Sequence, residues 1–263
     1  MAEVVFLIPT FNEERTIIDV LRRAEPFADL LVVVDDGSRD SSGDLIEQWC
    51  ETHRNVALLT HRRNQGMSGA LRTGFSYLLE LLRDGTLAAD AVVVTMDADG
   101  QHNPEETAEA LRTFAQDGAD VLLLRRDFSG YPRYKRVGNG LLSWWAGVLS
   151  GYPFRDVECG FRLMRLNVIA DIMPFFTGRA YGCAQELGIL PVRRGWRMDN
   201  TCVTNVAYYR QGARMRDGVT NALMGLRAFL RVTFGLRGAV AVDPAEFRVT
   251  CVPELAPSTA VDQ

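Results

Sequence analysis

Residues 92–102 read VVVTMDADGQH, an apolar run that ends in two aspartates separated by one alanine. A run of β-branched residues is typical of a strand buried in a parallel sheet. Because side chains two apart on an extended chain point the same way, Asp97 and Asp99 can converge on one cation at the end of that strand. Carboxylate oxygens suit Mg²⁺ or Mn²⁺, and two protein acids leave coordination positions for a substrate phosphate. Alternatively, the pair only caps the helix that follows.

The first half of the chain alternates strand-type runs with segments of helical period. The runs are residues 3–8, 30–34, 56–60, 91–96 and 119–124, and the helical segments are 13–25, 41–53, 66–84 and 104–116. This alternation predicts an α/β fold whose mainly parallel sheet is covered by helices on both faces. Ligands of such sheets sit at the carboxyl ends of the strands. The polar segments 9–13, 35–38, 61–66 and 97–101 all fall there.

Motif and composition exclude several classes of protein. The turn after the first strand reads PTFNE and not GxGxxG, so a nicotinamide enzyme is not expected. The net charge of −4 argues against nucleic-acid binding. Five cysteines without CxxC spacing argue against a zinc site or a disulfide framework and suit a reducing compartment.

Neither a signal peptide nor a membrane-spanning segment is expected. The first strand begins almost at once, without a basic segment or cleavage site before it. The longest charge-free window, residues 137–154, is broken by glycines, serines, an asparagine and a proline. We therefore expect a cytoplasmic protein with no transmembrane segment, in which this window forms a buried or interfacial helix.

The second half of the chain is rich in arginine and aromatic residues. Residues 200–242 contain six arginines opposed only by Asp217. Within residues 219–237, Arg227 and Arg231 lie one helical turn apart among apolar residues, which suits a helix in the headgroup region of a membrane. A core helix with a basic edge fits nearly as well. The proline-containing residues 241–263 are expected to form an extended or partly disordered tail.

Five motifs in order carry a resemblance to a known family. They are PTFNE at 9–13, VDDGSRD at 34–40, NQGMSGALRTG at 64–74, DADGQHNPEE at 97–106 and DVECGFRLM at 156–164. Together they resemble family 2 glycosyltransferases of the GT-A fold, and within them the dolichyl-phosphate mannose synthase and polyprenyl-phosphate sugar transferase branch. The resemblance implies one Rossmann-like, mixed but mainly parallel sheet flanked by helices. A catalytic domain would span residues 1–217, with a nucleotide half at 1–124 and an acceptor half at 125–217, followed by an amphipathic helix at 218–240 and a tail at 241–263.

The resemblance also implies a donor site in the first half of the chain. The nucleotide sugar would contact Pro9, Phe11, Glu13, Val34, Asp35, Asp36, Asn64, Gly66 and Ala98. The family often has tyrosine where Phe11 stands. For Asp35 and Asp36 the alternative is an Asx-turn with Gly37. Gln101 would support the metal held by Asp97 and Asp99, or else cap the helix that begins near residue 104.

The resemblance implies that arginines of the second half bind the phosphates of the substrates and that acidic residues there lie near the acceptor. Arg125 or Arg126 falls where the family has a substrate-contacting arginine. Arg210, Arg214 and Arg216 resemble its arginine, glycine, serine, lysine element, although the serine and lysine are not cleanly present.

Two residues of the DVECGFR motif are implied on the acceptor side. Asp156 would be a general base for a hydroxyl acceptor, or would only orient groups if the acceptor is a phosphate. Arg162 would bind an acceptor phosphate, and the alternative is an internal Asp156–Arg162 ion pair. Gln185–Glu186 resembles the family's acidic element on the same side.

The expected function is an inverting, metal-dependent transfer of a hexose from GDP-mannose or a UDP-sugar to a polyprenyl or dolichyl phosphate. The enzyme would bind Mg²⁺ or Mn²⁺ and sit peripherally on the cytoplasmic face of a membrane, where the lipid-phosphate acceptor lies. One alternative keeps the donor and takes a saccharide or small-molecule hydroxyl as acceptor. Another is an inactive sugar-nucleotide-binding or scaffold protein.

Overall fold

The computed structural model describes residues 2–177, 182–206, 215–238 and 242–254. An eight-stranded sheet has the order β10-β3-β2-β1-β4-β7-β5-β8. Its strands are β1 (Val4–Thr10), β2 (Leu30–Asp35), β3 (Val56–His61), β4 (Val92–Thr95), β5 (Val121–Leu123), β7 (Arg162–Arg165), β8 (Met198–Asp199) and β10 (Phe247–Cys251). A small second sheet pairs β6 (Arg125–Arg126) with β9 (Val203–Thr204). The pairs among β1, β2, β3 and β4 are parallel, and so is β5 with β8, whereas β10 and β7 run antiparallel to their neighbours.

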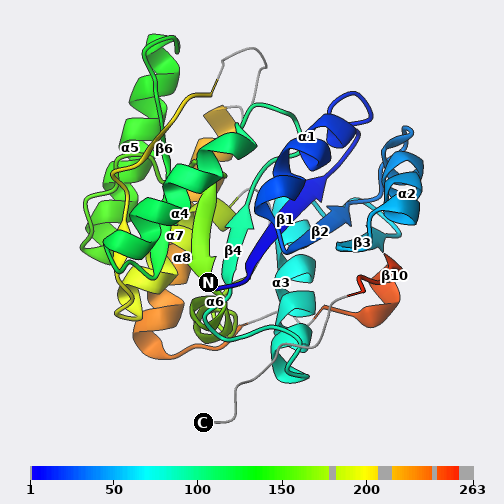
Figure 1. Cartoon of the computed structure of the whole chain (residues 1–263). Helices are drawn as coiled ribbons and strands as arrows, with labels where there is room; N and C mark the ends of the chain where they lie inside the picture. The colour runs from blue at the N-terminus through cyan, green and yellow to red at the C-terminus, as the bar shows by residue number, and fades with distance from the viewer. Residues whose placement is uncertain (1, 178–181, 207–214, 239–241, 255–263) are drawn as a thin grey trace.

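Helices cover both faces of this sheet (Figure 1). They are α1 (Ile17–Ala24), α2 (Ser42–Thr52), α3 (Met67–Arg83), α4 (Thr107–Gln116), α5 (Arg133–Ser150), α6 (Leu166–Ile172), α7 (Cys183–Arg193) and α8 (Met215–Phe234), with 3₁₀ turns η1 (Glu25–Phe27), η2 (Pro104–Glu106) and η3 (Pro244–Glu246). Figure 1 shows α1 and α2 on the side of β1, β2 and β3, and α5, α7 and α8 gathered on the other side of the molecule. Among the described residues, no helix has the length and apolar character needed to cross a bilayer.

Alternate residues of each strand feed two separate cores. In β1, Phe6 and Ile8 pack with α1, α2 and α4, whereas Val5 and Leu7 pack with α3 and α6. This division follows from the strand period, since successive side chains point to opposite faces of a sheet. Every residue of β2 is buried, as an α/β sheet covered on both faces requires. The α/β fold predicted from the sequence, mixed and mainly parallel, is therefore confirmed.

The main sheet contains three strands, β7, β8 and β10, that were not among the expected runs. The strand β7 inserts antiparallel between β4 and β5, and β8 pairs with β5 in parallel. Part of the expected tail forms η3 and β10, and β10 pairs with the edge strand β3. Backbone pairing with β3 supplies hydrogen bonds that composition alone does not reveal. The C-terminal helix begins at Met215, a few residues before the expected boundary.

A glycine lets α3 approach the sheet closely. A Cβ atom built on Gly74 would overlap the side chain of Leu7, whereas a Cβ on Gly138 in α5 would meet nothing within 4 Å. Both glycines lie inside helices, so they differ mainly in the space beside them.

We therefore expect Gly74→Ala to lower the free energy of unfolding by about 1–3 kcal/mol through overpacking. Gly138→Ala is the matched control and should leave stability unchanged or raise it by about 0.5–1 kcal/mol. Urea denaturation of both variants measures the difference. Equal stability of the two variants would show that α3 does not pack on β1 as described.

Candidate functional site

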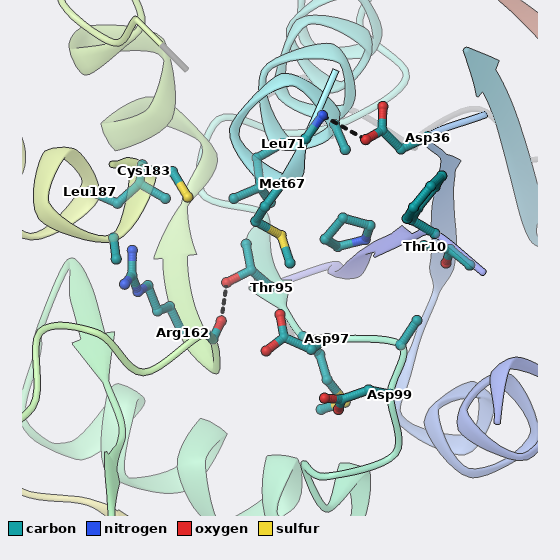
Figure 2. A pocket seen from close by; sticks show the side chains of 18 of the residues that line it. Thr10, Asp36, Met67, Leu71, Thr95, Asp97, Asp99, Arg162, Cys183 and Leu187 are labelled. Atoms are coloured by element: carbon teal, nitrogen blue, oxygen red, sulfur yellow. Dashed lines mark hydrogen bonds between the residues drawn. The ribbon is translucent and has the colours of Figure 1, made fainter. Parts of the chain in front are cut away.

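The carboxyl ends of β1 and β4 and the loop after β2 open onto a cavity of about 500 Å³. Several residues singled out in the sequence line it: Pro9, Phe11, Glu13, Asp36, Asn64, Gly66, Asp97, Ala98, Asp99 and Arg162. Figure 2 shows Asp97 and Asp99 side by side, with Asp36 and Arg162 on different walls. The fold thus brings together polar groups from all five sequence motifs at the edge of the sheet where ligands of α/β proteins bind.

Asp97 and Asp99 lie side by side in the wall of this cavity (Figure 2). Burial raises the pKa of Asp99, and the charge of Asp97 raises it further. Burial would also raise the pKa of Asp97, but its contact with His102, at 3.5 Å between Nε2 and Oδ2, holds it below the ordinary value. The charges of Arg126 and Arg162 act in the same direction. A cation bound between Asp97 and Asp99 at the end of β4 would relieve the repulsion between the two carboxylates, so the pair is suited to bind a metal ion.

Hydrogen bonds fix the loop that carries the two acids. The Thr16 hydroxyl donates to the Ala98 carbonyl at 2.8 Å, and the backbone N–H of Gln101 donates to Asp99 Oδ1 at 3.0 Å. Behind Asp97 lies Gly160, where an added Cβ would come within 2.9–3.1 Å of the Asp97 carboxylate. The carboxylates are therefore positioned by their surroundings before any ligand binds.

Gln101 meets the acidic pair through its main chain. The described residues lining the cavity do not include its side chain. It is not the helix cap either, because η2 begins after Asn103. Of the two roles expected for Gln101, capping is not seen, whereas support of a metal stays a prediction; in the structure the Gln101 N–H fixes Asp99.

The two aspartates after β2 have different surroundings. Asp36 accepts hydrogen bonds from the backbone N–H groups of Gln65 and Gly66 at 2.8 and 2.7 Å, and lies 2.6 Å from His61 Nδ1. It therefore ties the loop before α3 to the end of β2 while lining the cavity. Asp35 accepts from the N–H of Ser38 at 3.0 Å, which is the turn contact weighed as the alternative in the sequence, although it closes on Ser38 and not on Gly37.

The loop after β1 is joined to the loop after β2. Asn12 has a φ of 56°, a left-handed conformation that asparagine tolerates better than most residues. Its N–H donates to Ser38 Oγ at 3.0 Å, and the N–H of Glu13 donates to Ser42 Oγ at 2.8 Å. Phe11 projects beside this junction and is 40% exposed. An exposed aromatic ring at the cavity rim offers a face on which a planar ligand can stack.

Arg162 reaches the cavity because β7 pairs with β4. In the register of these strands Arg162 lies opposite Thr95, two residues before Asp97. Its Nε donates to the Cys159 carbonyl at 2.9 Å and its Nη2 to the Val157 carbonyl at 2.8 Å. The guanidinium is thus fixed by backbone contacts on the wall that faces the acidic pair.

Asp156 and Arg126 form a buried ion pair below the cavity. Arg126 Nε and Nη2 donate to the two Asp156 oxygens at 2.8 and 2.9 Å, and the Arg126 N–H donates at 3.0 Å. Burial opposes the charge of Arg126, but these contacts raise its pKa above the ordinary value. Asp156 is fully buried and is not among the described lining residues. The geometry therefore places it as an anchor for β6, with Arg126 as its partner in place of Arg162.

Other residues expected in the site lie elsewhere. Val34 is buried within β2, and Arg125 Nε reaches the Thr201 carbonyl at 3.4 Å on the small second sheet. Neither residue is among the described lining residues. Arg210 and Arg214 lie outside the described residues, and so does the side chain of Arg216.

The sequence did not point to Glu158 and Asn221, which also line the cavity. Glu158 accepts hydrogen bonds from Gln185 Nε2 at 2.7 Å and Asn221 Nδ2 at 2.8 Å. Burial raises the pKa of Glu158, against the opposing contact with Gln185 and charge of Arg162. Glu158 lies inside the DVECGFR motif and could have been considered there. Asn221 belongs to α8 and has no motif around it, so only the fold reveals it.

The oxygen donors fit a hard divalent cation that is bound partly by the protein and partly by a substrate. Among the described residues, no group of three or more His, Cys, Asp or Glu side chains is arranged to hold a metal. Asp97 and Asp99 would supply carboxylate oxygens, and phosphate and water would complete the shell, as is common for Mg²⁺.

Comparisons with known proteins agree with this site. The family model described as Glycosyl transferase family 2 matches residues 5–168, more than half of the chain. A UDP-N-acetylglucosamine–dolichyl-phosphate N-acetylglucosaminyltransferase of Methanococcus voltae is 25% identical, over 90% of this chain and 97% of that protein. An undecaprenyl-phosphate mannosyltransferase of Micrococcus luteus is 29% identical, over 82% of this chain and 88% of that protein.

A solved structure shares the fold. Glucosyl-3-phosphoglycerate synthase of Mycobacterium tuberculosis, in complex with uridine diphosphate, superposes with a TM-score of 0.62. The alignment covers 95% of this chain and 88% of that chain at 15% sequence identity. At this identity the likeness concerns the fold alone.

We expect Asp156→Asn to lower the free energy of unfolding by on the order of 3 kcal/mol, because it leaves the Arg126 charge without its counter-ion. Asp19→Asn, at an exposed pair with Arg22, is the control and should change stability by less than about 1 kcal/mol. Urea denaturation measures both. Unchanged stability together with lost turnover in Asp156→Asn would instead support the base role expected from the sequence.

Gly160→Ala tests the packing behind Asp97. The added methyl group would push the Asp97 carboxylate out of position, so we expect Mn²⁺ affinity to fall about tenfold or more while the chain stays folded. Isothermal titration with Mn²⁺ and a nucleoside diphosphate measures the affinity, and circular dichroism checks the fold. Gly130→Ala is the control, since a Cβ there would meet nothing within 4 Å. Equal affinity in both variants would contradict the positioning described.

Proposed function

The chain belongs to glycosyl transferase family 2, and we propose that it transfers a hexose from a nucleotide sugar to a polyprenyl phosphate with the help of Mg²⁺ or Mn²⁺. The observation that carries this proposal is the pair Asp97 and Asp99 at the end of β4, facing a cavity that Arg162 also lines. A GDP-mannose or UDP-sugar donor would enter this cavity, and direct displacement at its anomeric carbon would invert the configuration.

The main barrier of such a transfer is charge that develops on the departing nucleoside diphosphate. A divalent ion bound by Asp97 and Asp99 would act as a Lewis acid toward that leaving group. Arg162 supplies fixed positive charge on the opposite wall, where its guanidinium is held by two carbonyls. Charges that are already positioned need little reorganisation when the bond breaks, which lowers the barrier.

The nucleoside would occupy the end of the cavity formed by the loops after β1 and β2. Phe11 offers an aromatic face there, and Asn64 and Glu13 offer polar groups. Asp36 would act less by direct contact than by fixing the N–H groups of Gln65 and Gly66, to which its carboxylate is bonded.

The acceptor side favours a phosphate over a hydroxyl. A phosphate monoester is already an anion and needs no strong base, whereas a hydroxyl needs one. Asp156, expected from the sequence as a base for a hydroxyl acceptor or as an orienting group for a phosphate, has both oxygens bonded to Arg126. Two relatives act on lipid phosphates according to their names, dolichyl phosphate in one case and undecaprenyl phosphate in the other. We propose that the reaction takes place at the surface of a membrane, on its cytoplasmic face.

Glu158 is one of the carboxyl groups lining the cavity that could serve a hydroxyl acceptor, and unlike Asp156 it is bonded to neutral amides and not to an arginine. With a phosphate acceptor, Glu158→Gln should reduce kcat by less than about tenfold, because no proton has to be removed. With a hydroxyl acceptor the loss should be about 10²–10⁴-fold, the usual contribution of a general base. Initial rates with a short polyprenyl phosphate and with free saccharides distinguish the two.

Asp97→Asn and Asp99→Asn test the metal assignment. Each should lower kcat/KM by at least about a hundredfold and abolish Mn²⁺-dependent nucleotide binding, since a neutral amide is a poorer ligand than a carboxylate. Asp19→Asn, on the exposed side of α1, should behave like the wild type. Retained Mn²⁺-dependent affinity in both site variants would refute the assignment.

Nuclear magnetic resonance of the product should show the anomeric configuration opposite to that of the donor.

A further inference from the structure

Helix α5 carries a stripe of large apolar side chains on its solvent face. Tyr134, Val137, Leu141, Trp144 and Val148 are each 58–64% exposed. Their spacing of three and four residues places them on one side of the helix. The opposite side of α5 is buried, where Ser143, Ala146, Leu149 and Ser150 face the protein. The exposed stripe is thus separate from the buried side of α5, which packs against the rest of the protein.

Helix α8 shows the same arrangement. Val219, Leu223, Leu230 and Phe234 are exposed and lie on one side of the helix, while Met224 and Ala228 are buried on the other. Single exposed apolar residues are common on protein surfaces. Rows of large exposed apolar residues on two helices are uncommon and indicate a binding surface. We call these nine side chains of α5 and α8 the docking face.

The two helices that carry the docking face are neighbours. Trp145 Nε1 donates to the Ala222 carbonyl at 3.0 Å, which joins α5 to α8. Next to Ala222 lies Asn221, which lines the cavity and donates to Glu158. The residue after Ala222 is Leu223, a member of the docking face. Leu223 follows Asn221 by two residues, so α8 turns Asn221 toward the cavity and Leu223 toward the outside.

The charge on these helices differs from that of the whole chain. The protein has a net charge of −4, yet α5 and α8 contain six basic residues and one acid, Asp217. The side chains of Arg133, Arg136 and Arg227 are exposed. Large apolar residues with an exposed tryptophan, next to arginines, are the pattern of a surface that enters the headgroup region of an anionic bilayer.

We propose that the docking face of α5 and α8 binds the surface of an anionic lipid bilayer and so holds the cavity at the membrane. Because the acceptor proposed above is a lipid phosphate, this surface deepens the proposed function and rests on it. The local basic charge favours anionic lipid over a second copy of this acidic chain. Contact with the bilayer would let the phosphate of the acceptor reach Arg162 while its hydrocarbon chain stays in lipid.

Vesicle sedimentation tests the proposal with the full chain. We expect the wild type to bind vesicles of phosphatidylglycerol and phosphatidylcholine more tightly than vesicles of phosphatidylcholine alone, and less tightly as salt is raised. Leu141→Ser combined with Trp144→Ser should lower the partition coefficient at least about tenfold, since two large apolar side chains no longer enter the bilayer. Val252→Ser is the matched control, because Val252 is 75% exposed and lies after β10.

Fluorescence identifies which helix face enters the lipid. On binding vesicles the tryptophan emission should shift to shorter wavelength, and the shift should be lost in Trp144→Phe but kept in Trp145→Phe. A shift that survives Trp144→Phe would overturn the orientation proposed. Circular dichroism confirms that the serine variant is folded.

Activity separates this proposal from the proposed function. The serine variant should transfer sugar to a short, water-soluble isoprenyl phosphate at the wild-type rate, and lose activity only toward a long polyprenyl phosphate in vesicles. Vesicle binding without transfer to either acceptor would support the docking face and refute the proposed function. Absence of wild-type binding to vesicles would overturn the docking proposal. A wild-type dimer that dissociates in the serine variant would also overturn it and would indicate that the face binds a second copy of the chain.

Discussion

Asp97 and Asp99 bring two negative charges together at the end of β4, and much of the surrounding structure holds them in that place. The burial of the strand and the repulsion between the acids disfavour two ionised groups, as the raised pKa of Asp99 shows. Thr16 and the N–H of Gln101 fix the loop, and Gly160 leaves room for the Asp97 carboxylate. For the function proposed here, in which the site binds a cation and then releases a diphosphate, ligands that are already in position lower the cost of reorganisation.

The second half of the molecule completes the site through one antiparallel strand. Insertion of β7 beside β4 sets Arg162 opposite Thr95, and the Thr95 hydroxyl donates to the Gly160 carbonyl at 2.8 Å. From the same loop Glu158 extends to Gln185 in α7 and Asn221 in α8. A single short segment thus connects the proposed metal ligands Asp97 and Asp99 to α8, one of the two helices that carry the proposed docking face.

The parts of the fold that follow from local pattern were predictable from the sequence. The five strand runs and four helices of the first half appear with small shifts at their ends, because apolar period and burial act within each segment. The same reasoning found the residues after β1, β2 and β4. It did not find β7 or β10, since their pairing depends on distant partners. Asp156 shows the limit most clearly, because its motif marks it as important but only the fold shows that Arg126 occupies both of its oxygens.

The most direct test of the metal assignment is a crystal grown with Mn²⁺ and a nucleoside diphosphate, measured at a wavelength where manganese scatters anomalously. We predict one anomalous peak in contact with Asp97 or Asp99 and with the diphosphate, on the side of the cavity that faces Arg162. A diphosphate bound elsewhere, or one bound in the cavity with no manganese at these carboxylates, would contradict the account.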